Sequence, residues 1–358
     1  MTRRQRQKGL ASEVTPPLRR SDLGGTGIRR RRRGRGFSYL GPDAAVITEP
    51  RTLDRIRSLV IPPAWENVWI CTDPRGHIQA VGTDAAGRRQ YRYHDQWREQ
   101  QDRDKHDRVL EFGAALPRIR EVAGHHLADR GLTRERVLAA AIRLVDLGFF
   151  RSGGEEYAEQ NGTFGLATIT RDHVTLARGQ LVFEYPAKGA KQREQAVAED
   201  RVCAVVRSLL RRRQDGDQLL VYRAGSRWHD VTAADINDYL REISGGDYTA
   251  KDFRTWHATV LAAVGLAVSE PAASSDSARK RAIVRVVQEV AEYLGNTPAV
   301  ARASYIDPRV IDSYEAGHTI AATLGALGQD SHFGDLATTG RAEAAVVKLL
   351  ARNPRAAR

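Results

Sequence analysis

The sequence predicts an α+β protein, in which a small β-rich N-terminal domain precedes a larger, mainly α-helical domain that carries a three-stranded β-meander. Two patterns predict this class. Short runs that alternate apolar and polar residues lie between about 65 and 94, and apolar stripes of helical period dominate from about 105 onward. The length of 358 residues fits two or three domains with real cores. We expect the domains over 37–104 and 105–320, with a C-terminal helical extension over 321–358.

The first 36 residues are expected to form a disordered basic tail. This segment holds 12 Lys/Arg against 2 Asp/Glu, and so carries most of the chain's net charge of +12. Five of its arginines are consecutive, at Arg29–Arg33, and few apolar residues accompany them. Such a tail suits a polyanion such as nucleic acid, although a solvated arm that only aids solubility would look the same.

The N-terminal domain is expected to contain one helix and three strands. The helix covers Thr52–Leu59 and is ended by the prolines at 62 and 63. Turn residues separate the strands, which we expect at Val68–Ile70, His77–Gly82 and Arg88–His94.

The larger domain is expected to begin with helices over about 105–150, the last of which starts after Thr133 and ends at Gly148. The meander is expected at Leu166–Ile169, His173–Leu176 and Leu181–Tyr185. A lone strand is expected at 218–223, and further helices at about 194–212, 232–240, 252–268, 277–294, 297–305 and 339–352.

Several function classes lack their sequence signals. No apolar run approaches the ~20 residues that span a bilayer, and no apolar region follows the basic N-terminus as in a secretory signal. We therefore expect a soluble, intracellular protein. Two cysteines, Cys71 and Cys203, exclude a disulfide scaffold. The chain has no phosphate-binding loop, HExxH or paired CxxC motif, so neither ATP nor a metal cofactor is indicated.

The candidate site consists of basic residues at the ends of elements, together with one asparagine and one tyrosine. Arg151 follows a helix, Lys188 ends a strand, and Arg254 lies early in a helix within Lys-Asp-Phe-Arg-Thr-Trp. Asn296 and Tyr305 lie nine residues apart in a Leu-Gly-Asn-x8-Tyr pattern. Each residue alone suits a solvated charge or a packed aromatic. Their succession resembles the type IB DNA topoisomerases of the compact bacterial and poxvirus kind.

Two further runs carry the same resemblance, which covers roughly residues 37–315. Ile-Pro-Pro-Ala-Trp at 61–65 and Gln-Tyr-Arg-Tyr-His at 90–94 are each similar to family signatures. Several spaced motifs in the right order are specific, where any one of them would be weak.

The resemblance implies a chemical role for each matched residue. Tyr305 would attack a DNA phosphodiester, giving a 3′-phosphotyrosyl link and a free 5′-hydroxyl. Arg151 and Arg254 would clamp the non-bridging oxygens with their planar guanidinium groups. Lys188, on a hairpin, would protonate the departing 5′-oxygen, with Lys191 as a nearby competitor.

This sequence departs from the family pattern at two places. Asn296 stands where poxvirus members carry His, whereas bacterial relatives also have Asn at this position. Its amide can donate a hydrogen bond to a non-bridging oxygen but cannot exchange a proton near pH 7. Ala187, after Pro186, stands where the lysine loop usually begins with Gly, which makes that hairpin stiffer here.

The resemblance also implies how DNA is bound. Gln90, Tyr91, Tyr93 and Tyr157 match positions that contact DNA, and the spacing of two places both strand tyrosines on one face. It further implies a monomer that clamps double-stranded DNA in the bacterial cytoplasm, at the nucleoid. The reaction would relax supercoils without ATP, metal or other cofactor, because the bond energy is kept in the phosphotyrosine.

Two alternatives stay open at this point. A tyrosine recombinase shares the nine-residue spacing and the phosphotyrosyl intermediate, but its second arginine normally sits in a His-x-x-Arg box, where this chain has Lys251, and its N-terminal domain is helical. A non-catalytic DNA-binding relative is less well supported, because all five active-site positions hold workable residues.

Overall fold

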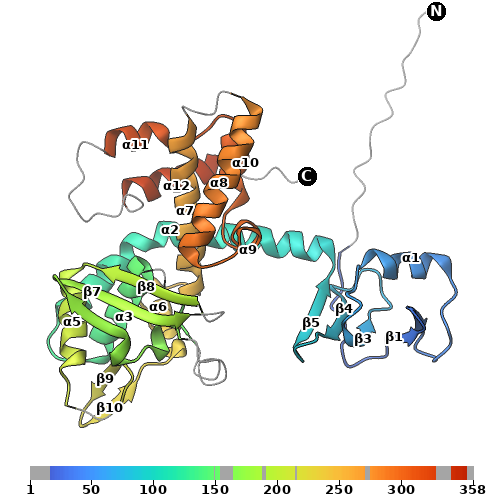
Figure 1. Ribbon diagram of the computed structural model, residues 1–358, viewed down its shortest axis with the longest axis horizontal. Coiled ribbons are helices and arrows are strands. Elements are labelled where there is room, and N and C mark those ends of the chain that lie inside the picture. Colours follow the sequence, from blue (N-terminus) through green and yellow to red (C-terminus); the bar gives the residue numbers. More distant parts are fainter. Residues whose placement is uncertain are drawn as a thin grey trace, which may run out of the picture. The chain divides into compact units, whose positions relative to one another are not determined.

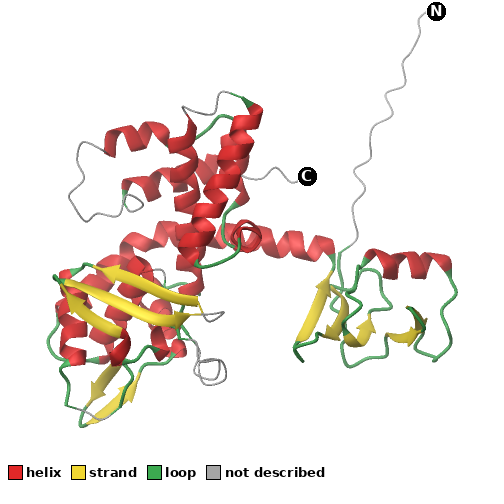
Figure 2. Ribbon diagram, in the orientation of Figure 1, coloured by secondary structure: helices red, strands yellow, loops and turns green. Residues whose placement is uncertain are grey.

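The computed structural model describes residues 17–148, 150–153, 164–187, 191–213, 216–270, 275–327 and 340–352. It divides the chain into two compact units, an N-terminal unit of residues 1–105 and a C-terminal unit of residues 106–358. Helix α2 (Asp95–Ala128) begins in the first unit and continues into the second. The predicted α+β class is confirmed, with an antiparallel sheet in the first unit and mainly helices in the second (Figures 1 and 2).

The N-terminal unit is a five-stranded antiparallel sheet in the order β2-β1-β3-β4-β5. Helix α1 (Pro50–Ser58) covers one face of it, where Ile56 packs with Ile28, Ile70 and Ala80 in a small core. The predicted helix and all three predicted strands are present. The strands are β1 (Ile28–Arg33), β2 (Gly36–Leu40), β3 (Glu66–Ile70), β4 (Ile78–Thr83) and β5 (Arg89–Tyr93).

The expected disorder of the tail up to residue 36 is wrong, because Arg29–Arg33 form most of β1 and pair in register with β2. A strand accommodates this charge density because successive side chains point to opposite faces. Arg30 points toward the core face, where it donates a hydrogen bond to the Pro62 carbonyl at 3.1 Å and lies 4.2 Å above the Phe37 ring. Residues 1–16 lie outside the described part of the chain.

The C-terminal unit is built around α7 (Ala250–Ser269), which is buried along most of its length. It packs against helices that precede it in the sequence and against helices that follow it (Figure 1). Its Trp256 and Phe253 are fully buried. The other helices are α3 (Arg134–Gly148), α5 (Asp200–Leu210), α6 (Ala233–Ser244), α8 (Asp276–Leu294), α9 (Pro298–Ser304), α10 (Pro308–Glu315), α11 (Ala321–Leu327) and α12 (Arg341–Arg352).

The β-meander exists but lies one strand later than predicted. Its strands are β6 (Val174–Ala177), β7 (Gln180–Ala187) and β8 (Lys191–Val197). The expected first strand at 166–169 is wrong, since Leu166–Thr168 form a short 3-10 helix. The expected start of a helix at about 194 is wrong, because residues 194–197 belong to β8. Pairing with β7 decides the conformation of this mostly polar segment. A further two-stranded hairpin joins β9 (Val221–Ala224) to β10 (Arg227–Asp230).

Helix α12 lies in the segment expected as a C-terminal extension, yet it belongs to the core of the C-terminal unit. Its Val346 and Leu350 are fully buried in the same cluster as α7. Among the helices described, none is both long and apolar enough to cross a lipid bilayer.

Candidate active site

Four of the five predicted catalytic residues come together in the C-terminal unit. Arg151 follows α3, Arg254 lies in the second turn of α7, Asn296 follows α8, and Tyr305 directly follows α9. Arg151 is hydrogen-bonded to Asn296, and the Arg254 guanidinium lies against the Tyr305 ring. The two pairs meet at the end of α8, where both arginines bind backbone carbonyls. The fifth, Lys188, lies outside the described residues; in the sequence it follows the last residue of β7.

Arg254 is the most deeply buried member of the group, with 3 % of its surface exposed. It donates a hydrogen bond to the Leu294 carbonyl at 2.8 Å, and its guanidinium lies 5.4 Å from the centre of the Tyr305 ring. Burial, followed by the positive charge of Arg151, lowers the pKa of Arg254 to about 10, against the opposing effect of Tyr305. A buried cation beside a phenol can stabilise negative charge that develops there.

The end of α8 positions both arginines. Gly295 adopts a left-handed conformation (φ 63°), and the amide of Asn296 donates to the Ala291 carbonyl at 2.8 Å, as in a Schellman motif. The last carbonyls of the helix are thereby left for other donors. Arg254 binds the carbonyl of Leu294, and Arg151 reaches the carbonyl of Gly295 at 3.4 Å.

Asn296 presents an unused donor. Its Oδ1 accepts a hydrogen bond from Arg151 at 3.2 Å, which fixes the orientation of the amide. The Nδ2 atom is buried and, among the described residues, has no acceptor. Buried amide donors are nearly always paired in native proteins, so this one is available to a ligand beside Arg151.

The nucleophile candidate is held through the backbone on its C-terminal side. Tyr305 is the C-cap residue of α9, and its ring is half-buried. Two residues later, the Asp307 amide donates to the buried Thr259 hydroxyl of α7 at 3.1 Å. The carboxylate of Asp307 in turn accepts hydrogen bonds from Arg309, whose guanidinium also binds the His106 carbonyl at 2.9 Å. These contacts anchor the Tyr305 segment to α7 and α2.

A third arginine, which the sequence did not single out, lies beside the group. Arg193 on β8 pairs across the strand with Tyr185 and donates to the Tyr293 carbonyl at 2.8 Å. Arg151, Arg193 and Asn296 line the same cavity, of about 530 Å³. Burial lowers the pKa of Arg193, and the nearby charge of Arg151 lowers it further. Arg193 carries no motif of its own, and only the pairing of β8 with β7 brings it to the cavity.

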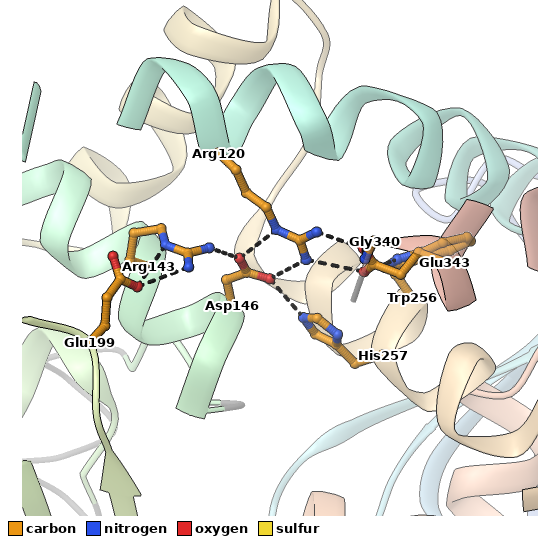
Figure 3. A network of polar contacts seen from close by, with 8 residues as sticks. All are labelled: Arg120, Arg143, Asp146, Glu199, Trp256, His257, Gly340 and Glu343. Carbon is orange, nitrogen blue, oxygen red and sulfur yellow. Dashed lines mark hydrogen bonds and ion pairs between the residues drawn. The ribbon is translucent and has the colours of Figure 1, made fainter. Parts of the chain in front are cut away.

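Behind these residues, a buried ionic network joins four helices and the start of a fifth (Figure 3). Asp146 of α3, almost fully buried, accepts hydrogen bonds from Arg120 of α2 at 2.8 and 2.9 Å and from Arg143. His257 of α7 lies 3.2 Å from the same carboxylate, and Arg143 also binds Glu199 at 2.9 Å. Burial alone would raise the pKa of Asp146, but hydrogen bonds from Arg120 and His257 hold that pKa well below its usual range.

Glu343 of α12 completes the network. It accepts hydrogen bonds from Arg120 at 2.6 Å, from the Trp256 indole at 2.9 Å and from the Gly340 amide at 3.2 Å (Figure 3). Trp256 and His257 lie two and three residues after Arg254 on α7, within one turn. The network therefore fixes the rotation of α7 at the turn that carries Arg254.

The predicted DNA-contacting residues of β5 lie in the N-terminal unit. Tyr91 and Tyr93 are 37 % and 40 % exposed, and their rings stack with centres 6.0 Å apart. Gln90 donates a hydrogen bond to Asp84 at 2.9 Å, and Arg89 lies 5.6 Å from the Tyr91 ring centre. Tyr157 lies outside the described residues. The DNA-binding role of all four stays a prediction.

Two family models match this chain. Residues 94–323 match the catalytic core of eukaryotic DNA topoisomerase I, and residues 36–84 match the N-terminal domain of bacterial DNA topoisomerase IB. Both matches favour the topoisomerase over the tyrosine recombinase considered above.

Relatives from several sources agree. DNA topoisomerase 1B of Acanthamoeba polyphaga mimivirus is 28 % identical over 297 residues, which are 81 % of this chain and 88 % of the viral protein. DNA topoisomerase 1B of vaccinia virus (strain Copenhagen) is 20 % identical over 235 residues, 65 % and 71 % of the two chains. DNA topoisomerase 1 of Drosophila melanogaster is 23 % identical over 167 residues, 45 % of this chain and 16 % of the fly protein. The chain therefore belongs to the type IB DNA topoisomerases, in their compact bacterial and poxvirus-like form.

Proposed function

We propose that this type IB topoisomerase relaxes supercoiled double-stranded DNA through a 3′-phosphotyrosyl intermediate formed on Tyr305. The tyrosine oxygen attacks the phosphorus of one strand, the bond to the 5′-oxygen breaks, and a 5′-hydroxyl leaves. While the strand is open the duplex swivels and loses supercoils. The 5′-hydroxyl then attacks the phosphotyrosine, which restores the phosphodiester and frees Tyr305.

The observation that carries this mechanism is the unused Nδ2 donor of Asn296 beside Arg151. The phosphorane transition state gathers negative charge on its non-bridging oxygens, which call for donors fixed in advance. Arg151 and Asn296 border one cavity and supply a guanidinium and an amide for those oxygens. Arg254 adds a second guanidinium next to the Tyr305 ring. Because an unpaired buried amide costs about 1–3 kcal/mol, its presence supports a site built for a ligand.

Each end of the reaction has a proton to move. A phenol with an ordinary pKa of about 10 is mostly neutral at pH 7, so the buried positive charge of Arg254 would favour the developing phenolate. The departing 5′-oxygen is a poor leaving group as an alkoxide. We assign its protonation to Lys188, on the strength of its match to the family's general-acid position.

The reaction exchanges one phosphodiester for another, so resealing draws on the bond energy of the phosphotyrosine and no ATP is consumed. The arginines, Lys188 and Asn296 supply the charge and hydrogen bonds that the transition state calls for. We therefore propose that the enzyme acts without ATP and without a metal ion.

DNA binding is assigned to both units. Gln90, Tyr91 and Tyr93 in the N-terminal unit and Tyr157 in the C-terminal unit match family positions that contact DNA. One chain supplies every residue of the constellation, so we propose a monomer that clamps the duplex. Its place of action would be the nucleoid in the bacterial cytoplasm.

The test is relaxation of a negatively supercoiled plasmid in EDTA without ATP, with Tyr305→Phe as the matched control. We expect the wild type to relax the plasmid and to form a covalent adduct with a 3′-phosphate, and the variant to do neither. Relaxation by both proteins would refute the assignment of Tyr305. Relaxation only after Mg²⁺ is added would refute metal independence.

A further inference from the structure

We propose that three arginines of β1, Arg29, Arg31 and Arg33, extend the DNA-binding face of the N-terminal sheet. This face would then reach from β5 across the sheet to β1. The enzyme would then hold duplex phosphates with β1 as well as with the tyrosines of β5. This inference rests on the proposed function, because it takes the exposed face of Tyr91 and Tyr93 as the DNA-facing side.

The strand register places these residues on one face. Arg29 pairs with Trp69, Trp69 with Val81, and Val81 with Tyr91, so the four form a row across β1, β3, β4 and β5. Directly opposed residues of antiparallel strands share a face. The register shifts of the sheet, between Glu66 and Trp69 and between Ile78 and Ala80, lie beside this row and do not interrupt it.

The same alternation extends the row along β1. Arg31 and Arg33 follow Arg29 at intervals of two residues and therefore share its face. The opposite face carries Ile28, paired with Ile70, and is the one that packs on α1. The arginine row thus points away from the small core.

The edges of this face are exposed, while its centre is covered. Arg29, Arg31 and Arg33 are exposed, as are Tyr91 and Tyr93. Between them, Trp69 is half-buried, and its indole donates to the Gly25 carbonyl at 3.3 Å. A ligand on this face would therefore meet cations at one edge and aromatic rings at the other, with a covered strip between.

The charge of the row is not compensated within the protein. In the described part of the chain, the guanidinium groups of Arg29, Arg31 and Arg33 form no ion pair and no hydrogen bond. By contrast, Arg30 on the core face binds backbone carbonyls, including that of Pro62 at 3.1 Å. Three like charges at intervals of about 6.8 Å repel one another unless a polyanion approaches, and duplex DNA carries one negative charge per about 1.7 Å of axis.

The shape of the hairpin favours contact with the DNA backbone over base reading. Only Ile28 and Arg29 of β1 pair with β3, so Arg30–Arg33 form a two-stranded ribbon with β2 that extends beyond the rest of the sheet. The ribbon reverses at Gly34, which has a positive φ of 56°. Long arginine side chains on such a ribbon can reach phosphates whatever the sequence, so we commit to phosphate contacts.

The experiment measures equilibrium binding of the full chain to a linear duplex over a range of salt concentrations. The test protein, called the row variant below, carries Arg29→Gln, Arg31→Gln and Arg33→Gln. A matched control loses the same number of positive charges from the other side of the unit, which α1 covers. Exposed arginines lie there on β1 and α1. The control substitutions are Arg32→Gln, Arg51→Gln and Arg57→Gln.

Three lost phosphate contacts should make the slope of log K against log salt shallower by about 2.7 in the row variant. The control should change that slope by less than about 1. Thermal unfolding of both variants checks that the sheet is intact. Equal slopes for the row variant and the control, in folded proteins, would overturn the inference.

A second readout separates this inference from the proposed function. At saturating DNA the row variant should form the covalent adduct at the wild-type rate, because the row touches no reacting group. A wild type that binds DNA with the expected slope but forms no adduct would refute the proposed function and leave the row in place. Adduct formation with an unchanged slope would refute the row alone.

Discussion

Replacing Asn296 with alanine should separate catalysis from stability. The substitution removes the Oδ1 atom that accepts a hydrogen bond from Arg151 at 3.2 Å, and it removes the buried Nδ2 donor that no described residue pairs. Loss of a hydrogen bond to a charged group lowers the free energy of unfolding by about 1.5–3 kcal/mol. Removal of an unpaired buried donor raises it by about 1–3 kcal/mol. The two effects offset, so the free energy of unfolding should change by no more than about 1 kcal/mol.

The effect on strand cleavage should be much larger. If Nδ2 donates to a non-bridging oxygen in the transition state, its loss removes one preorganised donor, which is worth about 2.7–4 kcal/mol. The rate of adduct formation should therefore fall by about 10²–10³. Asn296→His, which keeps an N–H donor at this position, should retain much more of the rate.

Single-turnover formation of the covalent adduct, at saturating enzyme, measures the chemical step, and urea unfolding measures stability. An alanine variant that cleaves at nearly the wild-type rate would refute the role of Nδ2. A loss of stability of several kcal/mol would show that the donor is satisfied in solution, and the offset argument would fail.

Three further predictions concern the contacts behind the site. Thr259→Val leaves the Asp307 amide unpaired, so unfolding should become easier by about 1–3 kcal/mol in a urea titration, whereas an unchanged midpoint would contradict the anchor. Glu343→Gln weakens the buried contacts of α12 with Arg120 and should lower the Tm. As a control, Asp276→Asn removes an exposed ion pair with Arg279 and should lower the free energy of unfolding by less than about 1 kcal/mol. The pKa of Asp146 is depressed in the folded state, so its contribution to stability is complete above the unfolded pKa of about 3.9 and is lost as the pH falls toward the folded value. Urea unfolding should therefore show a smaller loss of stability from pH 5 to pH 3 in Asp146→Asn than in the wild type, and parallel pH profiles would argue against the low pKa.

Elements with a clear hydrophobic period could be predicted from the sequence. The alternation in β3 to β5 gave three strands of the N-terminal sheet, and Thr133 and Gly148 marked the ends of α3. The elements that were missed are rich in charge. Strands β1 and β8 are mostly polar, and what fixes them is backbone pairing with β2 and β7, which depends on the partner strand and not on their own pattern.

The candidate site divides in a similar way. Arg151, Arg254, Asn296 and Tyr305 could be named because their order and spacing match a known family. Arg193 has no motif of its own and reaches the cavity only because β8 pairs with β7.

The ionic network was beyond prediction from the sequence. Arg120 and Glu343 are 223 positions apart and meet only in the folded core. Nothing in either local sequence distinguishes them from solvated surface charges. Buried ion pairs of this kind depend on tertiary packing, which a local pattern does not encode.

Glu343 follows all the candidate catalytic residues in the sequence, and this order bears on how the enzyme is made. A ribosome completes the arginines, Asn296 and Tyr305 before it reaches α12. Until Arg341–Arg352 emerge, the Trp256 indole and one side of the Arg120 guanidinium lack their carboxylate, and the apolar face that Val346 and Leu350 cover stays open. A nascent chain without α12 would thus hold every candidate catalytic residue while the helix that carries Arg254 is not yet fixed in place, and the emergence of α12 would supply the contacts that fix it.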